Sequence, residues 1–189
     1  MSYSVQQFQV PDLTPVQVRS MIDLLWLVWP NEQLTAEAAI AYFFEDQKNP
    51  LSHLRKLIYL VFDENGRAIA HAEGHLRVMF TARGEQEVMA LGGVCTHPDK
   101  RGLGLGAAVV RAAFSRVDNG AFPVSVFQTP VVDFYRRLGA GVCQSNTWVD
   151  RKNEANPNAH PWEPGETLMY YPASFDWPSG EIDINGGQY

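Results

Sequence analysis

Hydrophobic and polar residues change their spacing several times along this chain, and each change marks an expected element. Tyr3–Val10 alternates between the two kinds of side chain, which predicts a first strand. The following stretch, LTPVQVRSMIDLLWLVWP, repeats apolar residues at helical spacing, with Thr14 as N-cap, Pro15 at the first helical position and Pro30 as a stop. A second helix is expected to begin at Thr35. Two helices therefore precede most of the predicted sheet.

The rest of the chain is expected to alternate between strands and helices. Lys56–Asp63 is an apolar strand, and the Asn-Gly pair in the ENGR stretch after it favours a tight hairpin that returns over Ala68–Phe80. The later expected elements are a strand over Glu87–Thr96, a helix from about Gly102 to Val117, a strand over FPVSVFQ, a helix over Pro130–Leu138 ended by Gly139, and strands over Val142–Val149 and Thr167–Tyr171. Asn153–Gly165 is expected to be a long loop, and the final DWPSGEIDINGGQY a tail packed through Phe175 and Trp177.

Composition limits the class of protein. The chain has 189 residues, of which 46% are hydrophobic; this is enough for one well-buried core and short for two, so we expect a single domain over residues 1–189. There are 15 Lys and Arg residues against 21 Asp and Glu, and the formal net charge is −6, without a long basic run. Nucleic acid is therefore not expected as a partner.

The sequence predicts no membrane segment, signal peptide or metal site. Its most apolar run, Met21–Trp29, contains Asp23 and is far shorter than the roughly 20 residues of a membrane span. The first residues lack the basic and apolar regions of a signal peptide. Two cysteines, Cys95 and Cys143, cannot make a disulfide framework, and no zinc-ligand spacing occurs. We expect a soluble, cytoplasmic protein.

The stretch THPDKRGLGLGAAVV carries the most specific chemistry. Glycines alternate with larger residues directly behind Arg101 and run into an expected helix, so backbone N–H groups and a helix N-terminus could hold an anion. A P-loop would need a lysine after the glycines, and none follows. A dinucleotide fingerprint can be placed on Gly102, Gly104 and Ala107, but the acidic residue expected about 20 positions later is missing. The remaining pattern is Arg-x-x-Gly-x-Gly, filled by Arg101, Gly104 and Gly106.

This pattern, behind VCTHP, resembles motif A of the GNAT acetyltransferase superfamily. A second stretch, FQTPVVDFYRRLGA, is similar to that superfamily's later strand-to-helix signature, with Phe134-Tyr135 as its aromatic pair. Gln128 and Val131 stand where an Asn and an Ala are usual. The resemblance covers a motif core of about residues 56–149 and leaves a loop and tail over residues 150–189. It implies an α/β (α+β) GNAT fold, a mixed, largely antiparallel twisted sheet that is splayed at the coenzyme site and flanked by helices.

The resemblance implies direct transfer of an acetyl group from acetyl-CoA to a primary amine of a small, cationic acceptor. The backbone of β-strand residues Val94, Cys95 and Thr96 would pair with the pantetheine arm. Gly92 and Gly93 would leave room for the acetyl group and the acceptor. The pyrophosphate would lie on the turn and the helix start, whose expected coenzyme-binding residues are Arg101, Gly102, Leu103, Gly104, Leu105, Gly106 and Ala107.

The same resemblance assigns Tyr135 as the general acid that protonates the departing thiolate. The base is not identified; the nearest candidates are Glu73, His75 and Glu87, and strand alternation puts Glu73 and His75 on one face, where they could act together. AIAHAEGHLRVMF and EVMALGGVCTHPDKRGLGLGAAVV look most like the aminoglycoside 2'-N-acetyltransferase branch, in which a glutamate stands at the position of Gly92. Each catalytic assignment has a simpler alternative: a core tyrosine for Tyr135, and a solvated strand face for Glu73 and His75.

Two classes of function stay open. One is an acetyl-CoA-dependent N-acetyltransferase whose partner is a small-molecule amine, without metal, nucleic acid or membrane. The other is a non-catalytic CoA-binding module of the same fold that acts as a sensor or interaction subunit. Gly92 in place of a carboxylate favours the module, and Tyr135 favours the enzyme. A homodimer is compatible with either function.

Overall fold

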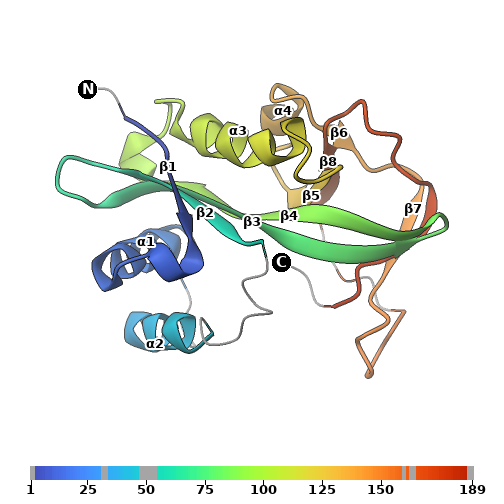
Figure 1. Ribbon diagram of the computed structural model, residues 1–189, viewed down its shortest axis with the longest axis horizontal. Coiled ribbons are helices and arrows are strands. Elements are labelled where there is room, and N and C mark those ends of the chain that lie inside the picture. The colour runs from blue at the N-terminus through green and yellow to red at the C-terminus, as the bar shows by residue number, and fades with distance from the viewer. Residues whose placement is uncertain (1–2, 31–33, 47–54, 159–160, 162–164, 187–189) are drawn as a thin grey trace. The chain divides into compact units, whose positions relative to one another are not determined.

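The computed structural model describes residues 3–30, 34–46, 55–158, 161 and 165–186 (Figure 1). The chain divides into two compact units. Unit 1 comprises Met1–His75 and Gly92–Ala113, and unit 2 comprises Leu76–Leu91 and Phe114–Tyr189. Strands β3 (Ala68–Thr81) and β4 (Gly84–Thr96) and helix α3 (Leu105–Asp118) run through both units. The expectation of a single domain stays a prediction.

Up to Arg136, helices and strands follow each other in the order that the sequence predicts. Besides α3, the described helices are α1 (Pro15–Val28), α2 (Ala36–Asp46) and α4 (Val132–Arg136), with short 3₁₀ turns η1 (Val10–Asp12) and η2 (Pro98–Lys100). Besides β3 and β4, the described strands are β1 (Gln6–Gln9), β2 (Leu57–Phe62), β5 (Ser125–Thr129), β6 (Gly141–Val142), β7 (Asn146–Val149), β8 (Thr167–Tyr171) and β9 (Gly180–Asp183). The strand order is β1-β2-β3-β4-β5-β8-β6, with β9 paired to β3 and to β7.

Local signals place the helices of unit 1. The Thr14 hydroxyl accepts a hydrogen bond from the Gln17 N–H at 3.3 Å, and the Thr14 N–H donates to Gln17 Oε1 at 2.9 Å, which is a complete capping box. The Thr35 hydroxyl accepts from the Ala38 N–H at 3.2 Å at the start of α2. Both predicted N-caps are therefore confirmed, and α1 ends at Val28, just before Pro30.

The strands of unit 1 form an antiparallel ladder. Ile58 of β2 lies opposite Phe8 of β1 on one side and Glu73 of β3 on the other. The hairpin between β2 and β3 turns at Gly66, whose φ of 76° is in the left-handed region. Figure 1 shows α1 and α2 side by side on one face of β1 and β2.

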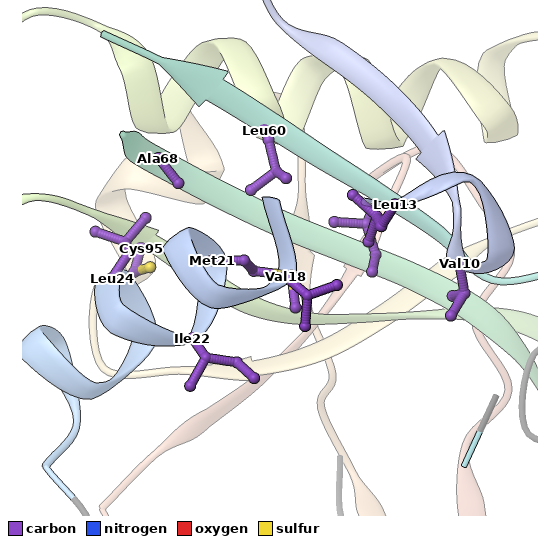
Figure 2. Close-up of a cluster of buried hydrophobic side chains, with 10 residues drawn as sticks. Val10, Leu13, Val18, Met21, Ile22, Leu24, Leu60, Ala68 and Cys95 are labelled. Atoms are coloured by element: carbon purple, nitrogen blue, oxygen red, sulfur yellow. The ribbon is translucent and has the colours of Figure 1, made fainter. Parts of the chain in front are cut away.

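The core of unit 1 lies between α1 and this ladder. Figure 2 shows Val18, Met21 and Leu24 of α1 with Leu60 of β2 and Cys95 of β4. The cluster is almost entirely aliphatic, and partly buried aromatic side chains such as those of α2 pack around it. Burying this face is what holds α1 on the strands, because isolated helices of this length are marginal in water.

Unit 2 combines antiparallel and parallel pairs. β5 pairs in parallel with β4 through Met89↔Ser125 and Ala90↔Val126, and antiparallel with β8, which also pairs antiparallel with β6. β7 and β9 are parallel. Together with unit 1, these pairs confirm the predicted mixed, largely antiparallel sheet flanked by helices. The parallel β4–β5 register covers only two residue pairs, whereas β5 continues to Thr129.

Aromatic side chains dominate the contacts of unit 2. Trp177 stacks on Tyr170 at 5.3 Å between ring centroids and on Trp148 at 6.2 Å, and its Nε1–H donates to Asn146 Oδ1 at 3.0 Å. Phe175 joins the same cluster, so the predicted packing of the tail through Phe175 and Trp177 is confirmed. Burial of these rings fixes residues 175–177 to the strands of unit 2.

The C-terminal third differs from the prediction in two strands. The strand expected over Val142–Val149 is two strands, β6 and β7, because Ser145 has a φ of 59°, a left-handed conformation that extended backbone does not accommodate. Within the turn-rich tail, Gly180–Asp183 forms the unpredicted strand β9. Its partners are far away in sequence, at Asn146–Val149 and Phe80–Thr81. Part of the loop expected over Asn153–Gly165, namely residues 159–160 and 162–164, lies outside the described residues.

Candidate active site

The glycine-rich stretch follows a short, well-anchored turn in unit 1. The His97 N–H donates to the Ile69 carbonyl at 2.9 Å, which ties the end of β4 to β3. His97 Nδ1 then accepts from the Asp99 N–H at 3.2 Å and caps η2. The Arg101 N–H closes this turn on the Pro98 carbonyl at 3.3 Å. The chain therefore reaches the glycines from a fixed direction, with Arg101 exposed.

Gly102 and Gly104 form the turn itself. Their φ angles are 80° and 78°, and no heavy atom lies within 4 Å of the position that a Cβ would take at either residue. Left-handed residues cannot continue an α-helix, so α3 begins at Leu105 rather than at the predicted Gly102. The first intrahelical bond joins the Ala108 N–H to the Gly104 carbonyl at 3.0 Å.

The turn presents backbone donors at the start of α3. The N–H groups of Leu105, Gly106 and Ala107 belong to the first helical turn and have no acceptor inside the helix. The partial positive charge of the helix N-terminus adds to them, and the exposed Arg101 directly precedes the turn in the chain. The predicted anion-binding residues therefore lie together in unit 1, and their geometry fits a phosphate or pyrophosphate group.

Two of the predicted coenzyme residues face the protein interior. The side chains of Cys95 and Leu105 are each 5% exposed, so only their backbone groups are available to a ligand. Burial raises the pKa of the Cys95 thiol to about 12, and this thiol therefore stays protonated at neutral pH. A buried structural thiol, rather than an acyl carrier, is the chemistry that this environment favours.

Gly93 contacts a residue that the sequence analysis did not single out. Its φ is 60°, and an added Cβ would lie 2.7 Å from Cε1 and 2.9 Å from Nδ1 of His71. His71, on β3, is 1% exposed, and its Nδ1 lies 2.7 Å from the Gly93 carbonyl oxygen. The space beside Gly93 is thus filled by an imidazole. The predicted roles of Gly92 and Gly93 toward the acetyl group and the acceptor stay predictions.

Glu73 and His75, the two candidate bases, follow His71 along β3. Glu73 lies opposite Ile58 in the β2–β3 register, so its side chain shares the face that α1 covers. Lys56 Nζ lies 3.0 Å from Glu73 Oε2, with 20% and 24% of the two side chains exposed. Burial pushes the pKa of Glu73 up, but the attraction of Lys56, His71 and His75 outweighs it, and the net pKa is lowered.

Tyr135 lies in α4 of unit 2 and is 5% exposed. Its ring packs on Phe127 at 4.4 Å between centroids and edge-on against Phe134 at 4.9 Å. Burial, followed by the charge of Glu166, raises the pKa of the phenol, so Tyr135 carries its proton at neutral pH. A raised pKa also makes the phenol a weaker proton donor. The structure therefore supports both a packed tyrosine and a protonated acid.

Two further polar side chains, Gln128 and Glu87, lie on the strands β5 and β4. Gln128 of β5 has a buried Oε1 for which the described part of the chain offers no hydrogen-bond partner. Glu87, at the other end of β4 from the glycines, is exposed in unit 2. Among the residues that the structure describes, no cluster of three His, Cys, Asp or Glu side chains could bind a metal ion. Over the same residues, every helix is too short or too polar to cross a membrane.

Several solved structures share the fold of this chain. The chain is similar to the GNAT family N-acetyltransferase YhbS from Escherichia coli in complex with CoA, with a TM-score of 0.61 and 10% identity over 97% of this chain and 91% of that chain. It is also similar to an acyl-CoA N-acyltransferase from Pseudomonas aeruginosa, with a TM-score of 0.58 and 14% identity over 89% and 99%. Glucosamine-6-phosphate N-acetyltransferase from Arabidopsis thaliana gives a TM-score of 0.56 and 16% identity over 74% and 91%. At these identities the likeness shows a shared fold, that of N-acetyltransferases.

Sequence comparison gives the family. The family model described as Acetyltransferase (GNAT) family matches residues 18–140, well over half of the chain, and the chain therefore belongs to this family. No curated protein sequence matches it significantly. The predicted superfamily and fold are confirmed, while the finer resemblance to the aminoglycoside branch stays a prediction.

Proposed function

We propose that this protein transfers an acetyl group from acetyl-CoA to a primary amine of a small, cationic acceptor. The observation that carries the proposal is the left-handed turn at Gly102 and Gly104, which leads from the exposed Arg101 into the N-terminus of α3. The solved CoA complex of YhbS, a protein of the same fold, supports the choice of coenzyme. The acidic net charge of −6 supports a cationic acceptor, because long-range attraction would raise its local concentration.

In this proposal the backbone of unit 1 binds the coenzyme. Val94, Cys95 and Thr96 offer their N–H and carbonyl groups to the pantetheine arm, and the N–H groups of residues 102–107 donate hydrogen bonds to the pyrophosphate beside Arg101. Acetyl-CoA supplies an activated acetyl group as its thioester. The contribution of the protein is then to hold this thioester next to the amine, which is a main source of rate in such reactions.

Proton transfer is assigned to side chains. A protonated amine must lose a proton before it attacks, and we propose the cluster of Glu73 and His75 as the group that accepts it. The ion pair with Lys56 and the lowered pKa make Glu73 a weak base, so the amine has to reach this site largely deprotonated or exchange its proton through water. Tyr135 is proposed to return a proton to the departing thiolate.

A second candidate is a CoA-binding module without catalytic activity. Two observations favour it: Gly92 stands where the aminoglycoside branch has a glutamate, and Glu73 is already paired with Lys56. The backbone geometry at residues 102–107 would serve such a module equally well, so activity alone separates the two candidates.

The deciding experiment combines titration of CoA binding with measurement of thiol release from acetyl-CoA. Aminoglycosides, polyamines, amino acids and peptides form the panel of acceptors. Release with one amine class establishes the enzyme and its acceptor class. CoA binding without release across the panel favours the module, and absence of CoA binding contradicts both candidates.

A pair of glycine variants tests the turn. Gly104→Ala places a side chain at a φ of 78°, and we expect it to weaken CoA binding because the donors of residues 104–107 shift. Gly120→Ala is the matched control: its φ is 80° and its Cβ position is equally open, but it lies at the other end of α3. Equal CoA affinity in the two variants would contradict the proposed role of the turn.

Tyr135→Phe tests the proposed acid. Removing the hydroxyl leaves the ring to pack on Phe127, so we expect the turnover number to fall by about 100-fold, the range of a lost general acid, with the dissociation constant of CoA unchanged. Tyr171→Phe is the control, because it also removes a tyrosine hydroxyl from unit 2, one that donates to Asp118 at 2.7 Å. Full turnover in Tyr135→Phe would remove Tyr135 from the mechanism.

A further inference from the structure

His71 is the most deeply buried ionisable side chain on the face of β3 that carries the candidate bases. It is 1% exposed, and its register partner on β2 is Leu60, a residue of the aliphatic core. Burial lowers the pKa of His71, against the opposing effects of Glu73 and the Gly93 carbonyl, so the imidazole is neutral at neutral pH. A neutral, buried histidine on this face is not required by the chemistry proposed above.

The contact with Gly93 fixes the state of the imidazole. A carbonyl oxygen can only accept, so Nδ1 must carry the proton and donate it to the Gly93 oxygen at 2.7 Å. Nε2 then holds a lone pair; it is buried and has no hydrogen-bond partner among the residues that the structure describes. One ring nitrogen is therefore committed to the backbone of β4.

Gly93 is built around this contact. Its left-handed φ of 60° is a conformation that glycine adopts in β-bulges, and the missing Cβ is what lets the imidazole approach. The Gly93 carbonyl oxygen thus accepts a hydrogen bond from a side chain at this point of β4. The direction of the backbone over Val94, Cys95 and Thr96 follows directly from the conformation at Gly93.

We propose that His71 is a positioning residue: its Nδ1–H holds the left-handed backbone at Gly93 and thereby orients the N–H and carbonyl groups of residues 94–96 toward the pantetheine arm of CoA. This inference rests on the proposed function, because it assigns these backbone groups to the coenzyme. His71 itself does not touch the reacting atoms in this role. Its removal should weaken coenzyme binding more than it weakens the fold.

The test compares two substitutions of His71 by titration with CoA. His71→Leu removes the donor, and we expect the dissociation constant of CoA to rise roughly tenfold, because the backbone of residues 94–96 is then no longer held in the binding orientation. His71→Asn keeps an N–H donor near the position of Nδ1 and should return the dissociation constant close to the wild-type value. Ile58→Val is the matched control, because it removes a methyl group from a fully buried residue of the same core; it should lower the Tm without changing CoA affinity.

A measurement on the wild-type protein makes the test independent of how well the variants fold. Long-range ¹H–¹⁵N correlation of labelled histidines at pH 7 should show His71 as the neutral Nδ1–H tautomer, assigned through its backbone resonances in the wild-type protein. An Nε2–H tautomer at this position would overturn the proposal, because Nδ1 would then carry no proton to donate to the Gly93 carbonyl. Equal CoA affinity in the wild type, His71→Leu and His71→Asn would overturn it as well.

The failure of the proposed function would look different. If the wild-type protein does not bind CoA at all, both the proposed function and the positioning role are wrong. If the wild type binds CoA and both His71 variants bind it with the wild-type affinity, only the positioning role is wrong.

Discussion

The two units of the molecule are built in different ways. Unit 1 has an aliphatic core between α1 and the strands, and it places its distinctive features in the backbone, at the left-handed Gly93, Gly102 and Gly104. Unit 2 has stacked aromatic rings, among them Trp177 on Tyr170 and Phe114 on Tyr171 at 3.8 Å. The candidate coenzyme site of unit 1 rests on backbone conformation, whereas the cluster around Trp177 in unit 2 rests on side-chain packing.

This difference predicts that the two units respond differently to substitutions. A backbone group points correctly only if the conformation of its neighbours is fixed, so the candidate coenzyme site depends on a few glycines and on contacts such as that of His71. An aromatic cluster tolerates small adjustments because its energy is spread over many contacts. Substitutions at Gly93 and His71 of unit 1 should therefore affect CoA binding and stability together, and those in the aromatic cluster around Trp177 of unit 2 should affect stability alone.

Gly93→Ala should have the largest effect on stability and CoA binding, and it is the strongest test of the difference between the two units. The new methyl group would meet His71 Cε1 at 2.7 Å at a φ of 60°, so strain and overpacking together should lower the free energy of unfolding by about 3 kcal/mol. CoA binding should weaken in the same variant. Urea unfolding and CoA titration measure the two effects.

Gly66→Ala is the control for backbone strain alone. Its φ is 76° and nothing lies within 4 Å of its Cβ position, so a loss of only about 1 kcal/mol is expected, without an effect on CoA affinity. If the two alanine variants lost the same stability, the contact between Gly93 and His71 would not be tight.

Trp177→Ala should be the next largest effect, and it tests unit 2. The variant removes two stacking contacts and the hydrogen bond to Asn146, but Trp177 is only partly buried, so a loss of about 2 kcal/mol is expected, below the range of a fully buried tryptophan. The folded variant should keep its CoA affinity, measured by titration well below its Tm. Weaker CoA binding at full folding would break the comparison between the units.

Substitution of Cys95 should have the smallest effect on activity, because its thiol has a structural role. Because burial raises the pKa of its thiol to about 12, the neutral form persists through pH 9, and labelling of the folded protein by a thiol reagent should stay slow between pH 7 and 9. Labelling of the protein in urea, where the thiol has its usual pKa of about 8.5, should accelerate over the same range. Cys95→Ala should leave turnover unchanged, and a loss of acetyl transfer in that variant would contradict the structural role of the thiol.

Sequence predicts well whatever is fixed by neighbours along the chain. Thr14 and Thr35 cap helices through residues three positions away, and the hairpin turn at Gly66 depends on its own φ preference. The glycine-rich stretch was found for the same reason, although the helix start moved to Leu105 because Gly102 and Gly104 are left-handed.

Long-range pairing accounts for what the sequence did not predict. β9 is a short strand in a turn-rich tail, and only its pairing with β7 and β3 makes it one. The ion pair between Lys56, just before β2, and Glu73 joins residues 17 positions apart, and the contact between His71 of β3 and Gly93 of β4 joins residues 22 positions apart. The spacing of His71 with Glu73 and His75 on alternate positions of one strand was the available signal, but it does not reveal a backbone partner.

The boundary between the units cuts through β3, β4 and α3 and not through a connecting loop. Neither unit could be produced from a continuous gene fragment, since each consists of chain segments separated by parts of the other. Unfolding one unit would disrupt β3, β4 and α3, which also belong to the other unit. We therefore expect a single cooperative transition in calorimetry, and we expect split-protein or domain-exchange designs to fail at this boundary.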